Sequence, residues 1–299
     1  MSVARPVAFS RRAALRQAGA PLVAGALGAA AWPLRAQQAG PGLPRLVTIG
    51  GAITEVVYAL GAQAQLVGSD TTSLYPEAAQ QTPKVGYMRQ LSAEGVLSLK
   101  PNAVIATSEA GPAVVLEQLR SAGVHVTLVP SRYTWQDVGA KVQAVGRAAR
   151  RELQARELQA RLDAEWAQVQ ARVAATRTTR LPRVLFILAH GATPQVAGRD
   201  TAAHALIQFA GGENALTGFA GYRPMTAEAL ASSAPDFILG TAQGIEALGG
   251  PERFWQRPEL ALTPAYRKRA LIAPDALLLL GFGPRLPEAV RGLHRGFAA

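Results

Sequence analysis

The sequence contains no cysteine among its 299 residues, and this absence removes several kinds of site at once. A chain without thiols forms no disulfide, no thiolate zinc site and no iron–sulfur cluster, and it has no cysteine nucleophile. Charged residues are scarce, at 17%, whereas 49% of the residues are hydrophobic, a balance that excludes a disordered chain. The 29 glycines and 20 prolines follow no repeating period, which excludes collagen-like and low-complexity proteins. What remains is a globular protein of one large or two medium domains.

Motifs of catalysis are absent as well. No Gly-x-Ser-x-Gly elbow offers a serine nucleophile, and no Gly-x-x-x-x-Gly-Lys-Ser/Thr loop is present to cradle a phosphate. The four histidines form no i, i+4 pair with a glutamate, and His125 lies inside an apolar strand pattern, where we expect a core residue. We therefore predict that the chain is not an enzyme and has no catalytic residue. A metal-dependent enzyme on a two-lobed scaffold is the alternative from another class.

Residues 1–36 have the pattern of a cleavable export signal. They hold five arginines and no acidic residue, and the stretch 18–34 is uncharged and rich in Ala, Leu and Gly. That stretch is too short and too broken by proline to cross a bilayer, and it ends at Leu34-Arg35-Ala36, a small-residue cleavage pattern. The run Ser10–Arg16 resembles a twin-arginine signal without the usual Phe, so the export route stays open. We predict a periplasmic protein.

Without this segment, the net charge is a weaker indication of nucleic-acid binding. The whole chain carries +11, but without the five leader arginines it keeps 26 basic against 20 acidic residues, a net charge of +6. The remaining basic residues are scattered and are not interleaved with aromatic residues. We therefore expect no nucleic-acid partner.

Short apolar runs alternate with helical patterns over the rest of the chain, which is typical of parallel α/β units. Strands are predicted at 46–49, 103–106, 125–128, 184–188, 237–239 and 271–273, and helices at 114–122, 201–210 and 286–297. Between residues 135 and 180 the chain becomes rich in Ala, Gln, Arg, Glu and Leu, with apolar residues at helical spacing. A coiled coil would need more heptads than this stretch holds. We predict an N-terminal lobe at 37–134, one long connecting helix at 135–180 and a C-terminal lobe at 181–299.

The two predicted lobes repeat one pattern. The segment 86–105 and the segment 221–239 each run from a Gly-Tyr turn through a Ser or Thr N-cap and a short helix with an early Glu to a proline and a buried strand. We interpret this as a duplicated lobe, with a cleft where the two copies face each other.

Four motifs then resemble one family. They are Asp70–Pro76, Val85–Gly95, Pro194–Gly198 and Leu280–Arg285. All four resemble the haem-binding substrate-binding proteins of bacterial ABC haem importers, and the similarity covers residues 44–297 in order. The resemblance implies two similar α/β lobes joined by one long helix, the rigid-helix type of periplasmic binding protein that also binds cobalamin and siderophores. A ferric siderophore or cobalamin carrier is therefore the alternative within the same class.

The resemblance also implies how the ligand is held. In this family a tyrosine at the position of Tyr75 binds the haem iron, and a phenolate is a hard donor suited to Fe(III). A phenol ordinarily titrates near pH 10, so a nearby cation should help it to ionise, and Arg223 is the expected hydrogen-bond partner. His190 follows the strand at 184–188, where α/β sheets bind ligands, and is a candidate for a second axial ligand or for a second stacked haem.

Further pocket and docking residues follow from the same resemblance. We expect Arg89 to pair with a haem propionate. The residues expected against the macrocycle are Tyr87, Met88, Tyr222, Met225 and Phe282. Glu94 and Glu228 hold the same place in the two repeats, where relatives dock to the permease dimer of the inner-membrane ABC transporter; charge complementarity at a helix N-terminus is the structural alternative. We expect a monomer that carries one or two haems.

Overall fold

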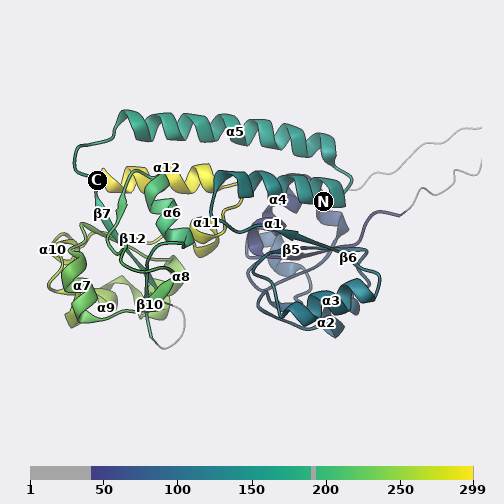
Figure 1. Ribbon diagram of the computed structural model, residues 1–299, viewed down its shortest axis with the longest axis horizontal. Coiled ribbons are helices and arrows are strands. Elements are labelled where there is room, and N and C mark those ends of the chain that lie inside the picture. The colour runs from purple at the N-terminus through teal and green to yellow at the C-terminus, as the bar shows by residue number, and fades with distance from the viewer. Residues whose placement is uncertain (1–41, 190–192, 299) are drawn as a thin grey trace, which may run out of the picture. The chain divides into compact units, whose positions relative to one another are not determined.

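The N-terminal lobe is a parallel sheet with helices on its faces (Figure 1). The computed structural model describes residues 42–189 and 193–298, so the predicted export signal lies outside the described residues. The strands, in the spatial order β2-β1-β5-β6, are β2 (Leu66–Ser69), β1 (Leu46–Ile49), β5 (Ala103–Thr107) and β6 (His125–Val129). The principal helices of this lobe are α1 (Gly51–Ala59), α2 (Ala93–Leu97) and α3 (Ala113–Ser121). Strands β1 and β5 are buried along their whole length, as expected of central strands covered on both faces.

The C-terminal lobe repeats this framework and adds antiparallel strands. Its sheet has the order β10-β8-β7-β11-β12, with β9 beside the start of β7. The strands are β7 (Arg183–Leu188), β8 (Gln195–Ala197), β9 (Glu213–Asn214), β10 (Tyr222–Pro224), β11 (Phe237–Leu239) and β12 (Leu271–Ile272). The helices are α6 (Ala202–Phe209), α7 (Ala227–Ser233), α8 (Ala242–Ala247), α9 (Gly250–Trp255), α10 (Pro264–Lys268), α11 (Ala276–Leu280) and α12 (Leu286–Phe297). The parallel trio β7-β11-β12 matches β1-β5-β6, which confirms the two similar lobes.

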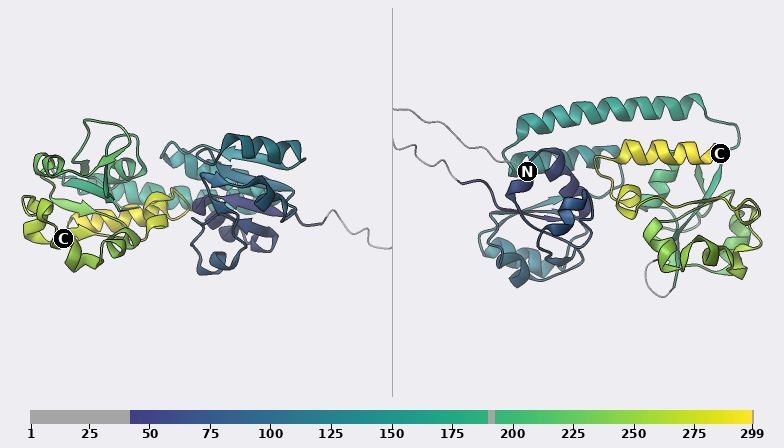
Figure 2. Two further views of the ribbon diagram at one scale, coloured as in Figure 1. Left: turned by 90° about the horizontal axis from the view of Figure 1, so that it is seen from below. Right: turned by 180° about the vertical axis from the view of Figure 1, so that it is seen from behind.

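The stretch 135–180 differs from the prediction of one long helix. It holds two helices, α4 (Trp135–Ala148) and α5 (Glu152–Ala175), which lie side by side (Figures 1 and 2). The chain reverses between them at Arg150, whose φ of 54° is in the left-handed region and cannot continue a helix. Helix α4 packs on α1 of the N-terminal lobe, whereas α5 also packs on α12 of the C-terminal lobe. The helix that joins the two lobes is therefore α5.

A row of aromatic rings connects these helices to the second lobe. Trp135 of α4 stacks on Trp166 of α5 with the centroids 4.7 Å apart, and Trp166 meets Phe209 of α6 edge-on at 5.0 Å. Phe209 lies 6.3 Å from Phe282, which in turn meets Tyr133 of the N-terminal lobe at 5.5 Å. Contacts of this kind add to the burial of the rings, and they hold Trp166, in the second half of α5, between α4 and α6.

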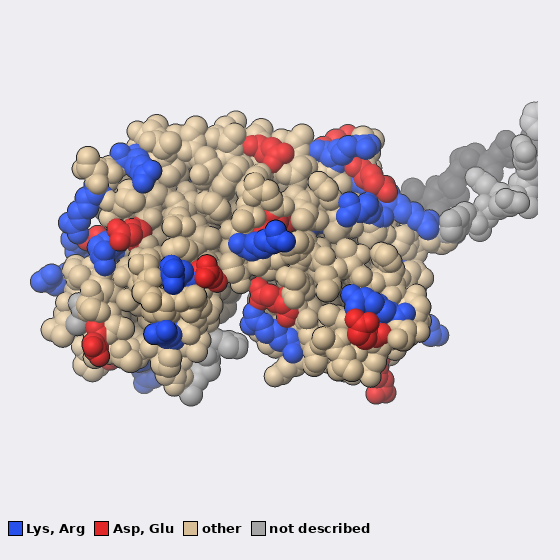
Figure 3. All heavy atoms as spheres, viewed as in Figure 1, with Lys and Arg blue, Asp and Glu red and all other residues tan. Residues whose placement is uncertain are grey.

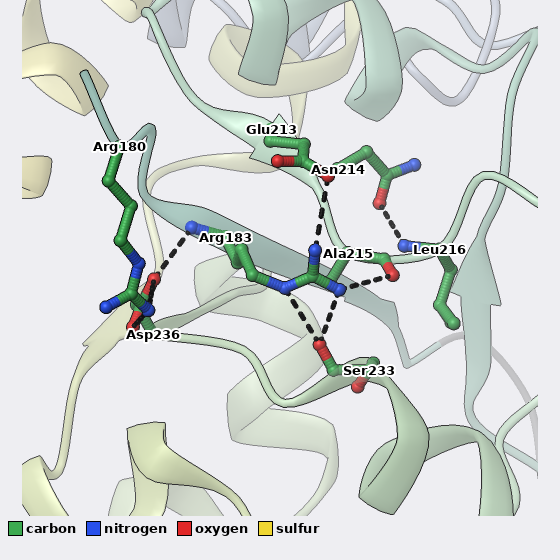
Figure 4. Close-up of polar contacts among 8 residues, drawn as sticks. All are labelled: Arg180, Arg183, Glu213, Asn214, Ala215, Leu216, Ser233 and Asp236. Atoms are coloured by element: carbon green, nitrogen blue, oxygen red, sulfur yellow. Dashed lines mark hydrogen bonds and ion pairs between the residues drawn. The ribbon is translucent and has the colours of Figure 1, made fainter. Parts of the chain in front are cut away.

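One arginine anchors the start of β7 and the end of α7 (Figure 4). The Arg183 guanidinium donates to the carbonyl oxygen of Ser233 at 2.9 and 3.2 Å and to Glu213 Oε1 at 3.2 Å. Its backbone N–H donates to Asp236, which also pairs with Arg180 at 3.1 Å. These bonds fix α7 relative to the sheet, which matters because α7 carries Glu228.

In the part of the chain that the structure describes, no helix is both long and hydrophobic enough to span a membrane.

Candidate binding site between the lobes

The loop that carries Tyr75 is fixed at its start by a buried carboxylate. Asp70 is fully buried and accepts hydrogen bonds from the backbone N–H of Gly50 at 2.9 Å and from the Thr72 hydroxyl at 2.7 Å. Thr72 Oγ1 in turn accepts from the Gly51 N–H at 2.9 Å. Backbone N–H groups at the start of a helix have no partner inside it, so the loop satisfies the N-terminus of α1 and is held there.

A lysine fixes the other side of the same loop. Lys84 Nζ donates to Ser69 Oγ at 3.0 Å, to the carbonyl oxygen of Ser73 at 3.1 Å and to that of Ala79 at 3.0 Å. Burial lowers the pKa of this lysine, and the nearby Asp70 charge opposes that shift. The loop is thereby held on both sides, and the Tyr75 side chain projects from it with 46% of its surface exposed.

The cation beside Tyr75 comes from the other lobe and is not the predicted one. The guanidinium carbon of Arg285 lies 3.6 Å from the centroid of the Tyr75 ring. Arg223, which we predicted as the partner of the phenol, lies instead over the ring of Phe219 at 4.6 Å. Arg285 belongs to the late motif at 280–285, so the sequence placed it among the relevant segments without giving it a role.

A second polar cluster forms the N-terminal-lobe rim. Arg89 donates to Glu109 and, at 3.3 Å, to the hydroxyl of Tyr87, whereas the Tyr133 hydroxyl donates to Glu109 at 3.0 Å. Burial opposes the charge on Arg89, but the hydrogen bond and the charge of Glu109 outweigh it, and its pKa is raised. Burial, with the charge of Glu109 adding to it, raises the pKa of Tyr133. No motif or spacing in the sequence points to Glu109 or Tyr133.

The C-terminal lobe presents the edge strand β10 to the same site. All three residues of β10 are exposed, and Tyr222 lies close enough to Glu109 and Arg89 of the first lobe to feel their charges. Although 36% of the Tyr222 surface is exposed, partial burial of its phenol, followed by the charge of Glu109, raises its pKa to about 12. Strand β10 thus brings Tyr222 and Arg223 to the rim opposite Arg89.

The remaining predicted pocket residues are more buried. Met88 is half-buried against the core of the first lobe and Met225 against that of the second. Phe282 is 3% exposed and packs within the core shared by the lobes, so its ring is not open to the gap as we expected. The Phe282 ring is buried because it packs between Tyr133 and Phe209 in the row of aromatic rings described above. His190 lies outside the described residues.

Between the lobes the surface is hollowed, and Figure 3 shows this as a notch along the lower edge of the view, with charged side chains of both signs on its N-terminal-lobe wall. Contacts between the lobes bring Arg285 to Tyr75 and bring Tyr222 close to Arg89. Within residues 42–189 and 193–298, no group of three or more His, Asp or Glu side chains is placed to hold a bare metal ion.

Glu94 and Glu228 lie where the repeat predicts, at the starts of short exposed helices. Ser92 caps α2 by accepting from the Gly95 N–H at 3.4 Å, and Thr226 caps α7 by accepting from the Ala229 N–H at 3.1 Å. Both glutamates are exposed. Both helices lie on the side of the lobes away from α5 (Figure 1).

The fold and this interlobe site together define a two-lobed α/β binding protein. A family model described as periplasmic binding protein matches residues 46–276, and the chain belongs to that family. This membership confirms the predicted fold class, and because the matched proteins are binding proteins, it confirms the prediction that the chain is not an enzyme.

Among solved structures the chain is similar to periplasmic haem-binding proteins. It is 45% identical to BhuT, solved in complex with two haems, with a TM-score of 0.82 and coverage of 86% of this chain and 98% of that one. It is 38% identical to RhuT from Roseiflexus sp. RS-1 (TM-score 0.81, 86% and 98% covered) and 33% identical to HutB of Vibrio cholerae (TM-score 0.74, 84% and 98% covered). Among curated proteins, the vitamin B12-binding protein of Vibrio vulnificus is 26% identical over 88% of this chain and 92% of its own.

Proposed function

We propose that this protein binds Fe(III) haem in the gap between its lobes, through the phenolate of Tyr75, and delivers it to an ABC importer of the inner membrane. One observation carries the proposal: Tyr75 projects, 46% exposed, from a loop fixed at both ends, with a guanidinium of the opposite lobe over its ring. The similarity to haem-binding proteins at 33 to 45% identity supports haem as the ligand.

The chemistry of the ligand fits these groups. An anionic oxygen donor suits ferric iron, and tyrosine is a known axial ligand of haem. The iron here is part of the cargo, so the protein needs no metal site of its own. A phenolate also tolerates an oxidising compartment, in which a thiolate would be at risk.

The rim residues supply the rest of the pocket in this proposal. Arg89 and Arg223 pair with the two propionates, one from each lobe, through charge-assisted hydrogen bonds. Tyr87 and Tyr222 contact the macrocycle, and so do Met88 and Met225 through the parts of their side chains that are not buried. His190 is the proposed second axial ligand, or the ligand of a second haem; BhuT, the relative cited above, was solved with two haems.

Transport requires a compartment and a partner. The family supports a periplasmic location, and we propose that residues 1–36 are the cleavable signal that sends the chain there. The exposed Glu94 and Glu228, one on each lobe, would contact basic residues of the two subunits of a permease dimer. We propose that the carrier is a monomer, because two similar lobes already match two permease subunits.

Hemin titration followed by absorbance tests the proposed ligand. The wild-type protein should give a Soret band and the charge-transfer band of a ferric tyrosinate. Tyr75→Phe should abolish that charge-transfer band and weaken binding by at least about 100-fold, since an axial bond is lost. Tyr266→Phe, which alters a tyrosine remote from the gap, is the matched control.

Other outcomes of the titration decide between the alternatives. An unchanged spectrum in Tyr75→Phe would reject Tyr75 as the ligand. Tight binding of cyanocobalamin or of a ferric siderophore, with none of hemin, would replace haem by the corresponding ligand. His190→Ala should alter the spectrum or the hemin stoichiometry, and no effect removes His190 from the site.

A further inference from the structure

Arg285 connects the two lobes through a buried ion pair. It lies just before α12 of the C-terminal lobe, and its guanidinium donates from Nε to Glu55 Oε2 at 3.0 Å and from Nη2 to Glu55 Oε1 at 2.6 Å. Glu55 belongs to α1 of the N-terminal lobe and is 5% exposed. Two parallel bonds of this kind fix both the position and the plane of a guanidinium.

The same guanidinium uses its flat face for a second contact. Its edge is taken up by Glu55, whereas its carbon lies 3.6 Å from the centroid of the Tyr75 ring. A cation over an aromatic face is attracted to it, and arginine makes this contact by stacking. The plane set by Glu55 therefore sets the plane of the tyrosine. A lysine, a point charge on a flexible stem, cannot do both.

The backbone that presents Arg285 is also closely fitted to the N-terminal lobe. A Cβ atom at Gly283 would lie 3.1 Å from the Ala52 Cβ and 3.4 Å from Glu55 Oε2, so a side chain there would press against α1. Lys141 of α4 donates to the carbonyl oxygen of Phe282 at 3.1 Å. The segment before Arg285 is thus held by two helices of the opposite lobe.

We propose that Arg285, anchored by Glu55, is the positioning residue for Tyr75: it orients the ring so that the hydroxyl oxygen faces the ligand. This inference rests on the proposed role of Tyr75 as the iron ligand. The C-terminal lobe would thus contribute to iron binding through Arg285, which contacts the tyrosine and not the iron.

The charged groups around Arg285 and Tyr75 keep the arginine protonated. Facing Arg285 are Glu55 from α1 and Asp275 before α11, whose carboxylate is 4.0 Å away, with Glu288 of α12 further out. On the tyrosine side, Lys84 and Asp70 hold the loop. Burial opposes the charge on Arg285, but the hydrogen bonds and the charge of Glu55 outweigh it, so the pKa of Arg285 is raised and it stays protonated.

The test is the pH at which the hemin complex loses its ferric tyrosinate band on acidification. Arg285→Lys should move this midpoint upward by about one pH unit while hemin still binds, because a ring that is no longer held in its orientation binds the iron less tightly and loses it to protons at a higher pH. Glu55→Gln should move it in the same direction by less. Arg269→Lys is the matched control, since Arg269 stacks over Tyr266 at 4.6 Å, remote from the gap, and it should move nothing.

Two additions keep the test decisive. If Arg285→Lys folds poorly, the pair Glu55→Gln with Arg285→Met avoids an unpaired buried charge and should give the same upward shift. In the ligand-free protein, the ring signals of 13C-labelled Tyr75, assigned by their loss in Tyr75→Phe, should move toward those of a free tyrosine in Arg285→Lys. That readout needs no haem and separates orientation from iron binding.

The outcomes separate this inference from the proposed function. If Tyr75→Phe removes the band but neither the midpoint nor the ring signals respond to Arg285→Lys, the positioning role is wrong and the iron ligand stands. If Tyr75→Phe leaves the band intact, the ligand assignment fails. Ring signals that respond while the midpoint stays fixed would limit Arg285 to structure and overturn its role in iron binding.

Discussion

The arginines on the rims of the two lobes differ in their partners. Arg89 of the N-terminal lobe is paired with Glu109, so much of its charge is offset before any ligand arrives. Arg223 of the C-terminal lobe lies over the Phe219 ring, and among the described residues no acidic side chain is within ion-pair distance of it. Its charge is therefore the more available to an anionic group. On the N-terminal rim the arginine is already held by an ion pair, whereas on the C-terminal rim the arginine's charge is not neutralised by an acidic side chain.

The two lobes are alike in the exposed glutamate that each presents, and a test of this likeness should give the largest effect of the predictions made here, a loss of haem uptake. Because α2 and α7 present equivalent exposed glutamates, Glu94→Lys with Glu228→Lys should reduce haem uptake by at least about tenfold while hemin affinity stays unchanged. Uptake by cells that lack the native protein is the measurement. Glu152→Lys with Glu157→Lys, the same charge change on exposed residues of α5, is the control. Normal uptake by the first pair would end the docking proposal.

The difference between the rims predicts unequal effects on affinity. Arg223→Gln should weaken hemin binding by about tenfold, because a charge-assisted bond is lost. Arg89→Gln should weaken it by only about threefold, since that arginine already shares its charge with Glu109 and its side chain is 55% exposed. Hemin titrations of both variants at one ionic strength measure the ratio. Equal losses, or the reverse order, would contradict the comparison.

The seam between the lobes predicts a smaller, pH-dependent effect on stability. Lys141 is 4% exposed, and burial lowers its pKa from 10.5 to about 8, with the charges of Asp137 and Glu109 opposing the shift. The folded protein then binds fewer protons than the unfolded chain between about pH 8 and 10.5, so the free energy of unfolding should rise with pH across that window. Below pH 8 the cost of burying the charge is present in full.

Urea unfolding of wild type and Lys141→Met over this pH range measures the contribution of Lys141 to the free energy of unfolding. Relative to the variant, the wild type should gain up to about 3 kcal/mol between pH 8 and pH 10.5, because each pKa unit corresponds to about 1.4 kcal/mol. Lys268→Met, an exposed lysine, serves as the control for general effects of high pH. Parallel stability curves for wild type and Lys141→Met would show that the lysine is not buried as described.

Much of the framework could be predicted from the sequence. The strands at 46–49, 103–106 and 184–188 are apolar runs interrupted only by Thr48, a pattern that is typical of buried parallel strands. The repeat was visible because equivalent caps and strands recur in the same order. One local error is instructive: His125 is exposed, because β6 is the edge strand of its sheet, and strand order cannot be read from an apolar run.

The site was predictable only in part. Motif resemblance singled out Tyr75 and the segment that contains Arg285, but not the contact between them. Tyr75 and Arg285 are 210 positions apart in sequence, and their contact depends on how the two lobes meet. The turn at Arg150 was missed because strong helix formers surround it, and only the packing of α5 on α12 requires the chain to reverse there. Glu109 was missed because a lone acid after a strand has no distinguishing pattern.

The most direct test of the account is a crystal structure of the protein crystallised with hemin. The account predicts a porphyrin between the lobes with the Tyr75 hydroxyl oxygen bonded to its iron and the Arg285 guanidinium still over the tyrosine ring. A porphyrin whose iron is held by another side chain, with Tyr75 turned out to solvent, would contradict it.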